Sequence, residues 1–184
     1  MTRPQFVAFS GSFSRPSKTR ALVAEAARRA VQTYGGAAHV FDVGDLGDDF
    51  AAPQGPGAAA QHHIQAVLAA DALIVASPVY KGSYTGLFKH FFDLIDPLAL
   101  AGKPVLLAAT GGGDRHALMI EHQMRPLFGF FESRALATGV YLSAADFDGE
   151  QIASPAASER LDRALTQFAA YLPGRAAAPL RAVI

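Results

Sequence analysis

Short apolar runs alternate along the chain with longer segments in which apolar residues recur at helical spacing. The short runs, each bounded by Gly, Pro or polar residues, predict strands at 5–10, 38–43, 72–77, 104–110 and 138–142. The longer segments predict helices at 17–34, 58–70, 84–96, 115–132 and 156–172. Strands that alternate with helices in this way indicate an α/β domain whose parallel sheet is covered on both faces.

Two doubly wound arrangements fit this alternation. A dinucleotide-binding sheet has six strands, so the five predicted strands favour a flavodoxin-like, doubly wound five-stranded parallel sheet. In both arrangements ligands bind beyond the carboxyl ends of the strands. We therefore expect functional residues after the first, third and fourth strands, in segments that we call the first turn (10–19), the second turn (77–84) and the third turn (110–116).

The rest of the chain adds no second domain. Residues 44–60 are rich in Gly, Pro and Asp and predict a loop, and residues 173–184 predict a loose C-terminal tail. The chain has 184 residues, which suits one domain with a sizeable core. We expect that single domain to span residues 1–172.

Charge and composition exclude several classes of function. The 16 Lys and Arg residues balance 16 Asp and Glu residues, whereas binding to nucleic acid or to an anionic membrane needs a basic surplus. Cysteine is absent, which excludes disulfides, thiolate metal sites, iron–sulfur clusters and thiol nucleophiles. Any redox chemistry therefore needs a bound cofactor. No apolar run is long enough for a signal peptide or a membrane span, so we expect a cytoplasmic protein.

Two predicted helices carry more apolar residues than one buried face needs. Charged residues make up only 17% of the chain, against about a quarter in typical domains. The segments 84–96 and 117–132 are apolar over more than one face, through Leu87, Phe88, Phe91, Phe92, Leu94, Ile95, Leu127, Phe128, Phe130 and Phe131. Because a helix that is apolar on all sides is buried on all sides, we expect a homodimer or a homotetramer. Pro126 is expected to kink or interrupt its helix.

The first turn is rich in hydroxyl groups and stands where a strand gives way to a helix. It contains only one glycine, Gly11, so it is neither a Gly-x-Gly-x-x-Gly fingerprint nor a Walker A loop. Hydroxyl and basic side chains follow, and no acidic residue occurs from 11 to 24: Ser12, Ser14, Ser17 and Thr19, with Arg15, Lys18 and Arg20. Helix N-termini favour anions, so this turn suits one phosphate monoester. The alternative is that Ser17 only caps the helix and the basic residues form a solvated surface.

The second and third turns suit a flat ring. In the second turn Pro78 fixes the backbone, Gly82 and Gly86 keep the segment slim, and Tyr80 offers an aromatic face. The third turn contains the triplet Gly111 to Gly113, which marks a backbone with positive φ or one that a ligand approaches closely. The alternatives are a tyrosine that packs at a helix start and a plain flexible loop. Together with the first turn, these features describe an FMN site.

These motifs resemble the NADPH-dependent FMN reductases, in particular those that serve two-component alkanesulfonate and methanesulfonate monooxygenases. The resemblance spans roughly residues 5–172, and its motifs are Gly11-Ser12 with the turn after it, Ser77 to Lys81, Tyr84 to Gly86, Leu100 to Pro104 and Ala109 to Gly113. It implies a flavodoxin-like fold and a reductase that uses NADPH, or NADH, to reduce FMN. The reduced flavin would then pass to a separate monooxygenase that cleaves the C–S bond of sulfonates.

The resemblance also assigns site residues. The positions that match the family's cofactor contacts are Ser12, Arg15, Ser17 and Thr19 for the phosphate, Pro78, Val79, Tyr80 and Lys81 for the ring and ribityl chain, and Thr110, Gly111, Gly112 and Gly113 for the ring edge. In the alkanesulfonate reductases the helix after the third turn carries a tyrosine, associated with an inserted π-helical turn at a tetramer interface. Here His122 stands in the matching stretch, as in the methanesulfonate branch; alternatively it is a polar residue at a subunit contact.

No catalytic acid or base is expected, since hydride transfer needs alignment more than proton transfer. Arg115 and His116 are candidates for contact with NADPH, or else a solvated helix start, and no metal site is expected at His62-His63. Two other functions stay open on this fold. One is a quinone or azo reductase that keeps its FMN, and the other is a flavodoxin-type electron carrier, which the neutral net charge disfavours.

Overall fold

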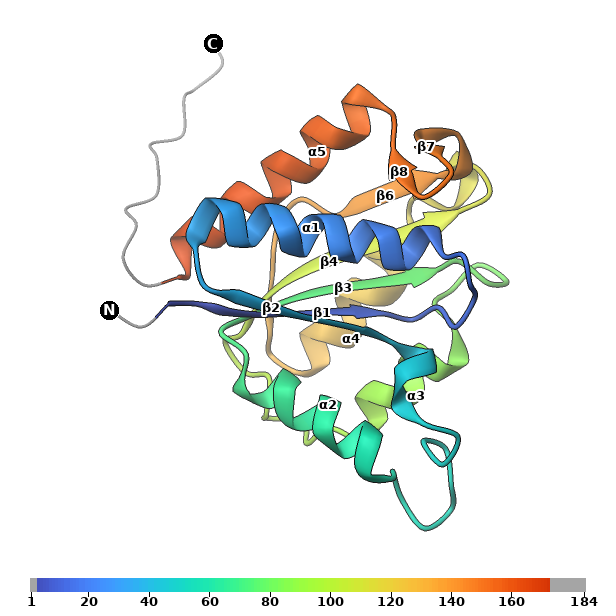
Figure 1. Ribbon diagram of the computed structural model, residues 1–184, viewed down its shortest axis with the longest axis vertical. Helices are drawn as coiled ribbons and strands as arrows, with labels where there is room; N and C mark the ends of the chain where they lie inside the picture. Colours follow the sequence, from blue (N-terminus) through green and yellow to red (C-terminus); the bar gives the residue numbers. More distant parts are fainter. Residues whose placement is uncertain (1–2, 173–184) are drawn as a thin grey trace.

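The computed structural model describes residues 3–172, and the predicted tail 173–184 lies outside the described residues. A parallel sheet forms its centre, with strands in the order β2-β1-β3-β4-β5 and with β6 also paired to β4 (Figure 1). The strands are β1 (Gln5–Ser10), β2 (Ala37–Asp42), β3 (Ala72–Pro78), β4 (Pro104–Gly111), β5 (Arg134–Ala135) and β6 (Val140–Ser143). This order is the flavodoxin-like one, which confirms the predicted fold class.

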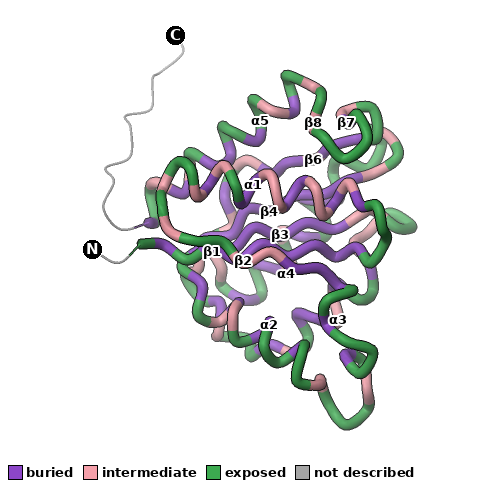
Figure 2. Tube along the Cα trace, in the orientation of Figure 1, coloured by how far each residue is buried: buried purple, intermediate pink, exposed green. Residues whose placement is uncertain are grey.

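Helices cover both faces of the sheet. On one face lie α1 (Lys18–Tyr34) and α5 (Pro155–Thr166), and on the other lie α2 (Ala58–Ala69), α3 (Gly86–Asp93) and α4 (Arg125–Phe130) (Figure 1). Side chains of one strand alternate between the two cores: Val7 and Phe9 pack toward α2 and α3, and Phe6 and Ala8 pack toward α1. The central strands are therefore buried on both sides, as Figure 2 shows, which explains why they read as nearly continuous apolar runs.

The register of the sheet brings the three turns to one edge. Ser10 at the end of β1 lies opposite Ala76 of β3, and Pro78 at the end of β3 lies opposite Thr110 of β4. The backbone N–H of Gly11 donates to Ala76 O over 2.7 Å, and that of Val79 donates to Thr110 O over 2.8 Å. These bonds hold the starts of the first and second turns against the neighbouring strands.

The last part of the sheet differs from the prediction. The strand predicted at 138–142 is present as β6, which pairs with β4, but β5 and a small hairpin of β7 (Phe147–Asp148) and β8 (Gln151–Ile152) were not predicted. Strands of two residues are too short to show a period-2 pattern, so the sequence did not indicate them. The segment predicted as a loop at 44–60 overlaps a 3₁₀ turn, Val43–Leu46, at its start and the first residues of α2 at its end.

The helix predicted at 115–132 is divided into three pieces. A 3₁₀ turn covers Asp114–His116, a π-helical turn covers Ile120–Met124, and α4 starts at Arg125. The N–H of Arg125 donates to Ile120 O, five residues back, and Pro126 has no N–H to donate. The predicted interruption at Pro126 is confirmed, and the π-helical turn is present with His122 in it.

Most of the apolar excess in the two helices is buried within the chain itself. Phe88, Phe91, Phe92, Phe128 and Phe131 belong to the core on the α2 and α3 side of the sheet. The two helices therefore leave less apolar surface for a partner than their sequence indicated. Phe130, which is 67% exposed, and Leu87, which is 36% exposed, do face outward. Among the residues that the structure describes, no helix is long and apolar enough to cross a membrane.

Candidate active site

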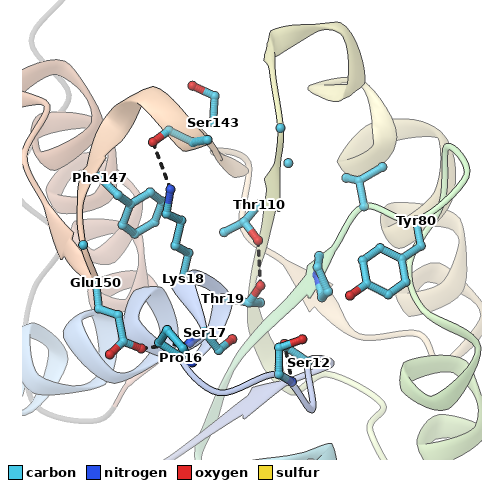
Figure 3. Close-up of a pocket in the computed structure, with 17 residues that line it drawn as sticks. Ser12, Pro16, Ser17, Lys18, Thr19, Tyr80, Thr110, Ser143, Phe147 and Glu150 are labelled. Carbon is cyan, nitrogen blue, oxygen red and sulfur yellow. Dashed lines mark hydrogen bonds between the residues drawn. The ribbon is translucent and has the colours of Figure 1, made fainter.

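A cavity of about 740 Å³ opens at the carboxyl edge of the sheet (Figure 3). All three turns line it, and the β7–β8 hairpin with the end of β6 closes it on one side. Nine of the twelve residues predicted to bind a cofactor line this cavity: Ser12, Ser17, Thr19, Pro78, Val79, Tyr80, Thr110, Gly111 and Gly112. The other three, Arg15, Lys81 and Gly113, do not.

Hydroxyl groups organise the first turn from within. The Ser10 hydroxyl accepts from the N–H of Ser12 over 3.3 Å, and the Ser12 hydroxyl accepts from the N–H of Ser14 over 3.2 Å. Ser17 is the N-cap of α1, and its hydroxyl accepts from the N–H of Arg20 over 3.2 Å. Ser17 thus caps the helix and lines the cavity, so the two readings of this serine are compatible.

The two arginines of the first turn pair with carboxylates outside the cavity. Arg15 and Arg20 both contact Asp42, which is fully buried at the end of β2, and Arg20 also contacts Asp45. Burial opposes ionisation of Asp45, but hydrogen bonds from the Asp42 backbone and from Arg20 hold its pKa below the ordinary value. The positive charge of these arginines offsets Asp42 and Asp45, a pairing that the acid-free stretch of sequence did not reveal. Of the three basic residues in this segment, Lys18 lines the cavity.

The second turn is a tight hairpin. Tyr80 and Ser83 exchange backbone hydrogen bonds of 2.9 and 3.2 Å, and the two residues between them, Lys81 and Gly82, have φ of 53° and 84°. Two consecutive positive φ values characterise a type I′ turn. The turn places Tyr80, 50% exposed, in the wall of the cavity and leaves Lys81 at its tip, outside the lining.

The glycines of the third turn have no positive φ, which removes one of the two reasons for expecting them there. The other reason, close approach by a ligand, is consistent with the geometry, because a Cβ added to Gly112 or Gly113 would meet nothing within 4 Å. A Cβ on Gly111 would lie 2.1 Å from the hydroxyl of Tyr141. That hydroxyl donates to Gly113 O over 2.5 Å, and burial raises the pKa of Tyr141, which keeps the donor protonated.

The structure adds lining residues to the twelve predicted cofactor contacts. Those in the first turn are Ser14 and Lys18, which the sequence singled out for their side chains, and Pro16; those from the end of β6 onward, which the sequence did not indicate, are Ser143, Ala144, Phe147, Gly149 and Glu150. Lys18 Nζ donates to Ala144 O over 3.2 Å and lies 5.6 Å from the centroid of the Phe147 ring. Glu150 Oε1 accepts from the N–H of Ser17 over 2.9 Å, across 133 residues of sequence.

Comparison with known proteins identifies the family. A family model described as NADPH-dependent FMN reductase matches residues 4–148. The chain belongs to this family. A protein named FMN reductase (NADPH) from Pseudomonas aeruginosa is 46% identical over 183 residues, which cover 95% of this chain and 96% of that protein.

Two other relatives extend the comparison. A protein named NADH-dependent FMN reductase SfnF from Pseudomonas putida is 55% identical over 111 residues, and the match spans 60% of each chain. A solved structure, the apo form of the NADH:FMN oxidoreductase EMOB, has a TM-score of 0.78 at 31% identity and covers 90% of this chain and 88% of that one. Among these relatives of the FMN reductase, some are named for NADPH and others for NADH.

The donor set of the cavity fits the cofactor that the family name implies. The N-terminus of α1 and the surrounding hydroxyls supply donors for a phosphate monoester. Gly112 leaves its wall of the cavity without a side chain, which suits the edge of a flat heterocycle. The volume lies in the range of small-molecule and cofactor sites, about 300–1,000 Å³.

The remaining candidates lie outside the cavity lining. Arg115, His116 and His122 are exposed and line no part of it.

His63, on α2, is mostly buried; its Nδ1 lies 2.9 Å from Nε2 of His39 on β2, and its ring stacks on Phe41. The sequence placed His62-His63 far from the predicted site, and the fold joins this pair to His39 at the sheet edge, with ligand atoms within 4.8 Å of one another.

Proposed function

We propose that this chain binds FMN in the cavity, reduces it with NADPH or NADH, and releases the reduced flavin to a separate sulfonate monooxygenase. The observation that carries the proposal is the composition of the cavity. A capped helix N-terminus with hydroxyl donors and a wall of glycines without side chains border one space. Membership of the NADPH-dependent FMN reductase family supports the same activity.

The proposed roles follow the three turns. FMN, when bound, supplies the ring that accepts a hydride from the nicotinamide. Ser12, Ser17 and Thr19 with the N-terminus of α1 would bind the phosphate, Pro78, Val79 and Tyr80 would contact the ring, and Thr110 to Gly112 would donate along its edge. Arg15 would act indirectly, through its ion pair with Asp42. Lys81 and Gly113 would also act indirectly, because their backbones shape the second and third turns.

We assign no catalytic side chain, because hydride transfer depends on stacking, alignment and exclusion of water. The chain would contribute orientation and main-chain donors rather than an acid or base. We also propose that the chain forms a homodimer or homotetramer in the cytoplasm. The outward-facing Phe130 supports self-association, and the dependence on NAD(P)H, an intracellular substrate, supports the location.

Steady-state oxidation of NADPH and NADH tests the function. Free FMN is varied in one series and a quinone in another, and the flavin content of the purified protein is measured. Saturable dependence on added FMN, with little flavin retained, is the expected result. Tightly retained flavin with a strong preference for quinone would instead support an acceptor reductase, and bound flavin without NAD(P)H oxidation would support an electron carrier.

A further inference from the structure

Glu150 brings a negative charge to the end of the cavity that is otherwise suited to an anion. It lies at the turn of the β7–β8 hairpin, directly after Gly149, whose φ is +58°. Its carboxylate accepts from the N–H of Ser17, the N-cap of α1, over 2.9 Å (Figure 3). Carboxylates and phosphates are both stabilised at such a helix start by the same unpaired donors and the same dipole.

We infer that Glu150 competes with the phosphate group of FMN for the start of α1 and thereby keeps the bound flavin exchangeable. This inference rests on the proposed function. A phosphate at the first turn and the Glu150 carboxylate at Ser17 would be two anions in one cavity, and like charges at short range repel. The carboxylate therefore has to leave when the phosphate binds, and its return favours release.

The surroundings of Glu150 allow this movement. Glu150 is an exposed residue in a short hairpin, and it also lines a second cavity of about 500 Å³ on the other side. Arg28 and Arg29 line that second cavity together with Glu25, which forms ion pairs with both arginines, so the displaced carboxylate would meet a largely neutralised surface. Phe147 of the hairpin packs in the core, so the hairpin has an anchor besides the contact of Glu150 to Ser17.

Exchangeable flavin is what the proposed reaction requires. A reductase that hands reduced FMN to another enzyme needs the flavin to leave after reduction. The other basic residues of the first turn, Arg15 and Arg20, pair with Asp42 and Asp45 and leave Lys18 in the cavity wall. Lys18 and Glu150 thus line the cavity as one basic and one acidic residue, so the formal charges of its lining side chains cancel.

Binding of FMN and of riboflavin to wild-type protein and variants tests this inference. Flavin fluorescence quenching gives each Kd, and stopped-flow mixing gives the dissociation rate. The variant Glu150→Gln removes the charge and keeps an oxygen that accepts from Ser17. Asp148→Asn removes one charge from the same hairpin, where the Asp148 side chain is exposed, and serves as the matched control.

We expect Glu150→Gln to lower the Kd of FMN by about two- to fivefold, the effect of an exposed charge contact, with slower dissociation. The Kd of riboflavin, which has no phosphate, should stay unchanged, and Asp148→Asn should have little effect on either ligand. An unchanged Kd of FMN, an equal gain for riboflavin, or an equal gain from Asp148→Asn would overturn the inference. Failure of the wild-type protein to bind FMN at all would contradict the proposed function instead.

Discussion

The hydroxyl of Thr19, near the start of α1, lies 2.6 Å from the hydroxyl of Thr110, at the end of β4. Both side chains are buried, and both line the cavity. This hydrogen bond joins the first turn to the third turn across 91 residues of sequence. The two walls of the proposed phosphate and ring sites are therefore fixed relative to each other by side chains as well as by the sheet.

Replacing one of these threonines should destabilise the fold more than replacing both. Thr110→Val keeps the shape and leaves the Thr19 hydroxyl buried without its partner, which costs about 1–3 kcal/mol. In the double variant Thr19→Val/Thr110→Val no hydroxyl is left unpaired, so most of that loss should be recovered. Urea unfolding measures both free energies. Additive losses in the double variant would show that the two hydroxyls do not depend on each other.

A methyl group at Gly112 should weaken FMN binding without destabilising the protein. An added Cβ meets nothing within 4 Å in the chain, so Gly112→Ala is tolerated structurally. The methyl would instead occupy the wall that we assign to the flavin edge. The expected result is an unchanged midpoint of thermal unfolding and a weaker Kd for FMN. Gly129→Ala on α4, where space is also open, is the control and should leave the Kd unchanged.

Tyr141→Phe should loosen the third turn. The variant removes the hydroxyl that donates to Gly113 O and keeps the packing of the ring. We expect a loss of about 0.5–1.5 kcal/mol in stability, the net value of one hydrogen bond, and weaker binding of FMN because the glycine backbone is less ordered. Hydrogen exchange of the amides of residues 111–113 provides a direct readout. Unchanged exchange would show that the sheet edge alone holds this turn.

Stability should fall when the pH drops below about 6.5, the ordinary pKa of histidine. Burial lowers the pKa of His63, with contributions from His39 and His62, while Asp45 opposes the shift. The unfolded chain therefore binds a proton at a pH at which the folded chain does not, and acid favours unfolding. Above that pH His63 causes no further change in the free energy of unfolding. In His63→Phe, which keeps the stacking on Phe41, unfolding measured from pH 7 to pH 5 should depend less on pH. His116→Asn, at an exposed position, should keep the slope of the wild-type protein.

Phe130→Asp should reduce self-association. Phe130 is 67% exposed on α4, and a charge at this position would be buried without a partner in any interface that covers it. Light scattering at micromolar concentration should give a dimeric or tetrameric mass for the wild-type protein and a smaller mass for the variant. A monomeric wild-type mass would contradict the predicted oligomer. Glu159→Lys, on the exposed side of α5, controls for a change of charge alone.

The sequence alone determined the central strands of the sheet and the location of the cavity. Buried parallel strands such as β3 and β4 are uninterrupted apolar runs, and their number restricts the order of the sheet. Because the carboxyl ends of such strands meet at one edge, the first, second and third turns were predictable as neighbours. Local chemistry also decided the interruption at Pro126, since a missing N–H acts within one helical turn.

Tertiary structure alone decided which charges surround the cavity. Arg15 reads as a phosphate ligand beside Ser17, yet its guanidinium pairs with Asp42, 27 residues away in sequence. Glu150 reaches Ser17 from a hairpin whose strands have two residues each and leave no periodic signal. Side-chain pairs of this kind depend on which segments the fold brings within a few ångströms, because charge interactions act through space and not along the chain.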